Sequence, residues 1–95
     1  MLDPTDLDAV HTFASQNRPL LALSNRAGCF ACCRMFAPRE ITVWVDGAAV
    51  AADDRVDGVT ALCPHCGVDA VLPSLSYSAL TDRLLADMQQ RWFAR

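Results

Sequence analysis

Apolar residues recur at helical spacing near both ends of the chain. We predict a first helix over residues 3–16, where Asp3 suits the N-cap and Pro4 the first helical position. Its apolar face contains Leu7, Val10 and Ala14. We predict a last helix over residues 81–93, opened by Thr81 as N-cap, with Leu80 and Leu85 placed for a hydrophobic staple. Its apolar stripe contains Leu84, Leu85, Met88 and Trp92.

The pattern between these helices changes to short extended segments. Residues 17–19 interrupt the first helix, and Leu20 to Leu23 is expected to form a second short helical piece ending near Asn25. Strands are predicted at Met35–Phe36, Glu40–Val45, Val59–Leu62 and Val68–Leu72. Ala48 to Asp57 has no useful period and is predicted to be an exposed loop or a loose hairpin arm.

Four cysteines in two pairs dominate the middle of the chain. Cys29 and Cys32 form one Cys-x-x-Cys pair, and Cys63 and Cys66 form another that carries Pro64 and a following glycine. Two such turns can direct four thiolates at one point, which is the ligand set of a tetrahedral structural zinc site. We therefore predict one zinc ion bound by these four residues. Iron is the less favoured occupant, because four thiolates at this spacing also hold iron.

These patterns together predict an α+β fold. A zinc-ribbon or treble-clef-like core of short strands over residues 28–72 would be preceded by one helix and followed by another. At 95 residues the chain is expected to be a single zinc-binding domain, residues 1–95. So short a chain buries a limited apolar core, so a metal ion would contribute much of its stability.

Composition and charge restrict the expected cellular location and the class of binding partner. The N-terminus is acidic and lacks the basic-then-apolar pattern of an export signal, and no apolar run approaches the length of about 20 residues that spans a bilayer. Five cysteines in such a chain indicate metal ligands in a reducing cytoplasm before disulfides. Eight arginines, no lysine and a net charge of −3 disfavour a nucleic-acid-binding protein.

Several motifs outside the bare cysteine spacing occur in a fixed order from residue 28 to residue 93. They are Gly28-Cys29-Phe30-Ala31-Cys32, Phe36-Ala37-Pro38, Glu40-Ile41 with Trp44, Thr60-Ala61-Leu62-Cys63-Pro64-His65-Cys66-Gly67-Val68-Asp69, and Met88 to Phe93. In this order they resemble a family of small uncharacterised bacterial cytoplasmic proteins. The resemblance implies a zinc-ribbon-like core and brings no activity with it. The chain departs from that pattern in extra residues at 49–56 and in Cys33.

The leading functional hypothesis is a non-enzymatic structural zinc domain that docks onto a protein, including a second copy of itself. A four-cysteine site leaves no open position for a substrate, and the two histidines, His11 and His65, do not suffice for hydrolytic chemistry. One alternative is a nucleic-acid-binding ribbon, which would need its arginines on one face. Another is a redox sensor in which Cys33, otherwise a small buried residue, attacks or replaces a ligand. His65 is expected at the surface, and His11 at the boundary of the core.

Overall fold

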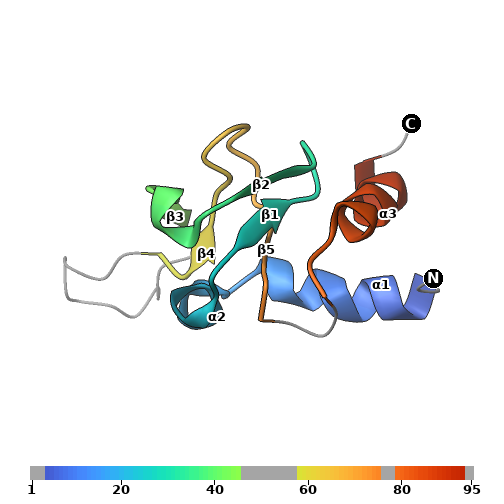
Figure 1. The fold of residues 1–95 in the computed structure, drawn as a ribbon, viewed down its shortest axis with the longest axis horizontal. Coiled ribbons are helices and arrows are strands. Elements are labelled where there is room, and N and C mark those ends of the chain that lie inside the picture. Colours follow the sequence, from blue (N-terminus) through green and yellow to red (C-terminus); the bar gives the residue numbers. More distant parts are fainter. Residues whose placement is uncertain (1–3, 46–57, 76–78, 94–95) are drawn as a thin grey trace.

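The computed structural model describes residues 4–45, 58–75 and 79–93 (Figure 1). In chain order its elements are α1 (Pro4–His11), the 3-10 turn η1 (Thr12–Ala14), α2 (Arg18–Leu23), β1 (Ala27–Cys29), β2 (Arg34–Phe36), the 3-10 turn η2 (Pro38–Glu40), β3 (Trp44–Val45), β4 (Thr60–Ala61), β5 (Val71–Pro73) and α3 (Asp82–Phe93). Within the described ranges, no helix is long and apolar enough to cross a bilayer.

The strands form two small antiparallel sheets. One has the order β2-β1-β5, with Gly28 of the central strand opposite Met35 on one side and Leu72 on the other. The other pairs β3 with β4, placing Trp44 opposite Ala61. The helices α1 and α3 contact each other, η1 contacts β5, and Leu85 of α3 lies over Gly28 of the central strand β1. The predicted α+β class with a small zinc-ribbon-like core is therefore confirmed.

The first predicted helix is shorter than expected as an α-helix. Its regular α-helical turns end at His11, and residues 12–14 continue as the 3-10 turn η1. Gln16 then adopts a left-handed backbone conformation with φ of 50°, which redirects the chain. The segment expected only to break the helix instead opens α2, because Pro19 lies in its first turn, where a missing N–H costs nothing. The predicted start at Asp3 lies outside the described residues.

The strand predictions are partly wrong. The strand predicted over 40–45 forms only at Trp44–Val45, because the Glu40 carboxylate accepts the Ala37 N–H at 2.8 Å and closes the 3-10 turn η2 instead. The strand predicted from Val68 begins only at Val71, since the Val68 carbonyl is used by the Cys63 N–H in a turn. The central strand β1 was not predicted. The loop expected at 48–57 lies outside the described residues.

The last helix begins as predicted. The Thr81 hydroxyl accepts the Leu84 N–H at 3.0 Å, which is the N-cap bond. The side chains of Leu80 and Leu85 converge over Gly28, where an added Cβ would lie 3.4 and 3.0 Å from them. The absence of a side chain on the central strand thus lets the helix approach the sheet closely.

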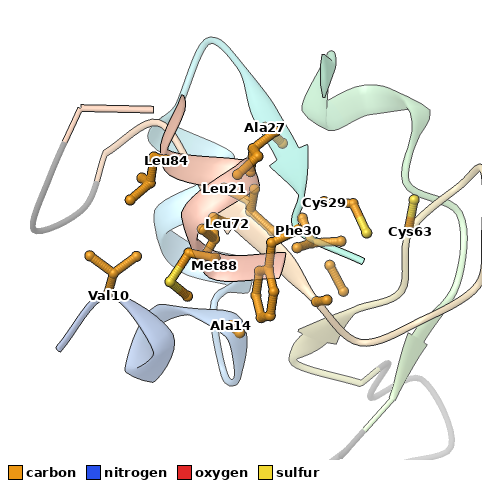
Figure 2. Close-up of a cluster of buried hydrophobic side chains, with 14 of the residues drawn as sticks. Val10, Ala14, Leu21, Ala27, Cys29, Phe30, Cys63, Leu72, Leu84 and Met88 are labelled. Carbon is orange, nitrogen blue, oxygen red and sulfur yellow. The ribbon is translucent and has the colours of Figure 1, made fainter. Parts of the chain in front are cut away.

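The core lies between the helices and the larger sheet (Figure 2). Of the predicted stripe on α3, Leu84, Leu85 and Met88 are buried. Trp92 is only half-buried and stacks on His11, with ring centroids 4.2 Å apart. Figure 2 shows the sulfur atoms of Cys29 and Cys63 at the edge of this core.

Asn17 is a buried polar residue whose amide joins three parts of the fold. Its Nδ2 donates to the carbonyl of Phe13 at 3.0 Å and to that of Val71 at 2.8 Å. Its Oδ1 accepts the Ala61 N–H at 3.1 Å. Both ends of the amide are therefore satisfied although the residue is 1 % exposed. One side chain ties the helical segment to a strand of each sheet.

We predict that Asn17→Asp destabilises the protein by about 3 kcal/mol or more. A carboxylate keeps the size of the side chain but leaves the buried carbonyl of Val71 and the part-buried carbonyl of Phe13 without this donor. Urea denaturation followed by circular dichroism would measure the loss. Asn25→Asp is a matched control, because only its Oδ1 is used, as an acceptor from Ser74, and it is exposed. Equal stabilities of the two variants would contradict the role of Asn17.

Candidate metal centre

The four paired cysteines meet at one point. All four Sγ atoms lie within 4.8 Å of one another. The separation is 3.6 Å between Cys29 and Cys66, and 3.7 Å between Cys32 and Cys63. Four sulfurs at about 2.3 Å from a central zinc would be about 3.8 Å apart in a tetrahedron. The arrangement therefore fits a metal ion bound by four sulfurs.

Each pair belongs to a turn that is fixed by the strands on either side. The first turn joins β1 to β2, and it places Cys29 at the end of β1. The second turn follows β4 and is closed by two backbone bonds, from the Cys63 N–H to the Val68 carbonyl and from the Gly67 N–H to the Cys63 carbonyl. Since β1 also pairs with β5, the strand after the second turn runs beside the first turn. This pairing brings cysteines more than 30 residues apart to one site.

Backbone N–H groups point at the sulfurs. The Ala31 N–H lies 3.3 Å from Cys29 Sγ, and the N–H groups of His65 and Cys66 lie 3.3 and 3.4 Å from Cys63 Sγ. Such contacts stabilise a thiolate, because they place partial positive charge next to it. The turns are therefore suited to anionic sulfur, the form that binds metal.

Burial raises the pKa of a thiol and so opposes the effect of these N–H groups, to a different extent at each cysteine. Burial raises the pKa of Cys29 well above its ordinary value, despite the backbone N–H groups that lower it, and burial also raises the pKa of Cys32. Burial raises the pKa of Cys63 as well, but the backbone N–H groups of Cys66 and His65, together with the side chains of Cys32 and Cys66, outweigh this effect and the net pKa is lowered. A metal ion would have to displace the proton from Cys29 and would offset the cost of its buried charge.

The two turns differ in their surroundings. Phe30 in the first turn is 2 % exposed, and its ring contacts His11, Trp92 and Phe93. The Ala31 carbonyl also accepts a hydrogen bond from Gln89 of α3 at 2.9 Å. The first turn is thus fixed to the last helix, a contact that the sequence analysis missed because a glutamine on a helix carries no signal of its target.

The second turn lies at the surface. Pro64, His65 and Cys66 are exposed, so the expected surface position of His65 is confirmed. The His65 ring lies against Phe36, and its Nδ1 is 3.4 Å from Arg34 Nη1. Arg34 therefore places a positive charge beside the cysteine turns, which would favour four thiolates around a divalent metal ion, a group with a formal charge of −2.

Cys33 is not part of the sulfur cluster. It is half-buried against the core, and burial together with the nearby Asp82 carboxylate raises its pKa. A raised pKa keeps the thiol protonated and poorly nucleophilic. These surroundings give no support to the redox-sensor hypothesis.

The backbone of Cys33 is nevertheless unusual. It has φ of 59°, and Gly67, which follows the second cysteine pair, has φ of 78°. Cys33 and Gly67 occupy equivalent positions directly after the two Cys-x-x-Cys turns. The left-handed conformation favours glycine there, because a Cβ atom destabilises it. Cys33 therefore stands where the geometry of the turn prefers glycine.

The sequence prediction for the site agrees with this geometry in the four residues it names, which the structure brings together. Searches of family models, of curated proteins and of solved structures gave no match to the chain. The resemblance to small bacterial proteins therefore stays a prediction from the motifs. Fold and site together define a small α+β protein with a zinc-ribbon-like core and four cysteines placed to hold a metal ion.

We predict that Cys33→Gly is more stable than Cys33→Ala by about 1 kcal/mol. Both variants remove the thiol, and they differ only in the Cβ atom that the left-handed backbone disfavours. At an ordinary position the order is reversed, because glycine loses more chain entropy on folding. Chemical denaturation of both metal-loaded variants would decide the order. Higher stability of the alanine variant would contradict the proposed conformation.

Proposed function

We propose that this protein is a non-enzymatic structural zinc-binding domain that acts as a protein-docking module. The observation that carries the proposal is the convergence of four cysteine sulfurs within 4.8 Å of one another. Such a set binds a metal ion with no ligand position left for substrate or water. The metal then stabilises a surface and takes no part in a reaction.

Zinc is the metal that we propose for this site, ahead of iron. Two separations of 3.6 and 3.7 Å suit a tetrahedron of sulfurs around zinc, and zinc has no redox chemistry that would require a partner for electrons. Iron also binds four thiolates, so the geometry alone favours neither metal. Four cysteines in two Cys-x-x-Cys turns are a common ligand set of closed structural zinc sites, which supports the assignment to zinc. Thiolate ligands further suit a reducing compartment, and we propose a cytoplasmic location.

The distribution of histidines supports a non-catalytic role. His11 stacks on Trp92, while His65 lies against Phe36 beside Arg34 at the exposed turn. Among the described residues, neither imidazole ring makes a hydrogen bond to a serine, a carboxylate or a thiol, which argues against a general base acting on a nucleophile.

Exposed apolar side chains support docking onto a protein. Leu23 is 75 % exposed and Val43 is 52 % exposed. Leu75 and Phe93 are also largely accessible. Contact with another protein would remove such side chains from water, which is the main driving force of association.

The arginines support protein docking over nucleic-acid binding. Arg34 lies beside the second cysteine turn, while Arg83 and Arg91 pair with Asp87 and Asp8. Arg18 and Arg39 lie elsewhere, around one groove. The described arginines, including the exposed Arg26, thus lie in several different parts of the fold, and two of them are paired with carboxylates, which does not favour a single basic surface along a phosphate backbone. Arg55 and Arg95 lie outside the described residues.

We predict that the purified protein contains about one zinc ion per chain, and that Cys63→Ser loses most of it. Cys63 supplies one of the four sulfurs, whereas Cys33 supplies none, so Cys33→Ser should keep its zinc. Elemental analysis of the three proteins after gel filtration measures the content. Iron in place of zinc would overturn the metal assignment alone, and equal zinc in both variants would contradict the ligand set.

We predict that the zinc-loaded protein does not bind random DNA or RNA with sub-micromolar affinity. The net charge of −3 opposes phosphate binding, and apolar docking is not screened by salt. Gel-shift titrations at low and moderate salt test this. Tight binding that weakens steeply as salt rises would replace protein docking by nucleic-acid binding as the function.

A further inference from the structure

A groove of about 530 Å³ opens between α2, η2 and β3, away from the sulfur cluster. Its walls include Leu21 of α2, Pro38 of η2 and the ring of Trp44 on β3. Apolar side chains therefore provide much of its lining. A smaller hollow with Val43 in its wall adjoins the groove, and the two share Arg18 and Trp44.

The charged residues that line the groove all carry the same sign. Among the described residues of its wall, these are Arg18 and Arg39, and no aspartate or glutamate is present. This contrasts with the chain as a whole, which has a net charge of −3. Arg39 is exposed at the edge of the groove. The groove thus offers an apolar surface with a positive edge on an acidic protein.

The aromatic part of the wall is held in place before any ligand arrives. The Arg18 guanidinium lies 4.5 Å from the centre of the Trp44 ring, and its Nη1 donates to the Gly58 carbonyl at 2.9 Å. The backbone N–H of Arg18 also donates to the Val59 carbonyl at 3.0 Å. Since these contacts fix the ring, a ligand would lose little entropy in ordering it.

We infer that this groove binds an acidic peptide segment of a partner protein, with a carboxylate at Arg39 and a neighbouring apolar side chain against Ala22, Pro38 and Trp44. Charge complementarity selects the occupant: a guanidinium binds a carboxylate well, and the positive edge disfavours basic segments. A polynucleotide would place many phosphates near an acidic protein, whereas a short peptide places a few carboxylates at this groove only. The inference rests on the proposed docking function and identifies its surface.

Selection of a displayed library of random short peptides on the immobilised, zinc-loaded protein tests the inference. We expect the selected peptides to combine aspartate or glutamate with an apolar residue. Their affinities are then measured by fluorescence anisotropy of the labelled synthetic peptides. Arg39→Glu should weaken binding at least about tenfold, because it replaces attraction of a carboxylate by repulsion.

Three variants make the measurement specific. Arg39→Gln should weaken binding by a smaller factor than Arg39→Glu, and Trp44→Ala should weaken it through loss of the apolar wall. Arg83→Gln is the matched control: it removes one positive charge from α3, outside the groove, and should leave the affinity unchanged. Zinc content and circular dichroism of each variant establish that it is folded. If Trp44→Ala fails to fold, the two Arg39 variants still decide.

Each other outcome overturns the inference in a recognisable way. Selected peptides whose affinity is unaffected by the Arg39 variants would place docking on another surface and leave the proposed function standing. Enrichment of basic peptides, or of none, would reject the acidic occupant and remove support for docking as well. Single-stranded oligonucleotides that bind more tightly than the peptides and depend on Arg39 would assign the groove to nucleic acid.

Discussion

The convergence of four sulfurs at one point is the constraint on which the rest of the structure depends. Cys29 and Cys32 belong to the hairpin β1–β2, which packs under α3, whereas Cys63 and Cys66 follow β4 of the smaller sheet. A metal ion bound to all four joins these two parts. Its binding can contribute on the order of 10–16 kcal/mol, as much as the net stability of many domains. Without the metal ion, strand pairing would stabilise the two sheets only weakly, because their strands are very short.

Two further side chains, in addition to the four cysteines, join the helices to the rest of the structure. Phe30, between the first two cysteines, inserts its ring among residues of α1 and α3, so that the first turn is fixed to the helices. Asn17 does the same by hydrogen bonds, joining the end of η1 to β5 and β4. In the second cysteine turn Cys63 is buried and the His65 ring lies against Phe36, but Pro64, His65 and Cys66 are exposed. The first cysteine turn is therefore fixed to the core, whereas the second cysteine turn completes the site from the surface.

The sequence predicted what depends on local pattern. The cysteine spacing identified the ligand set, and Thr81 with Leu80 and Leu85 identified the start of the last helix, because capping and staple contacts join residues close in sequence. It did not predict β1, since Ala27-Gly28-Cys29 lacks alternation and becomes a strand only through its neighbours on both sides. The hydrogen bonds of Asn17 join residues up to 54 positions apart, and no local pattern announces them.

Metal binding and the accessibility of the groove are connected. The strands of both sheets are two or three residues long, so the two sheets need further packing to hold them together. Four cysteines that bind a metal replace part of that packing between the two sheets. Trp44 can then remain half-buried at the surface, beneath the Arg18 guanidinium, although large aromatic residues are usually used to fill a core. In the proposed docking function the metal would thus act indirectly, by holding the two sheets together while an aromatic ring and an apolar groove stay accessible.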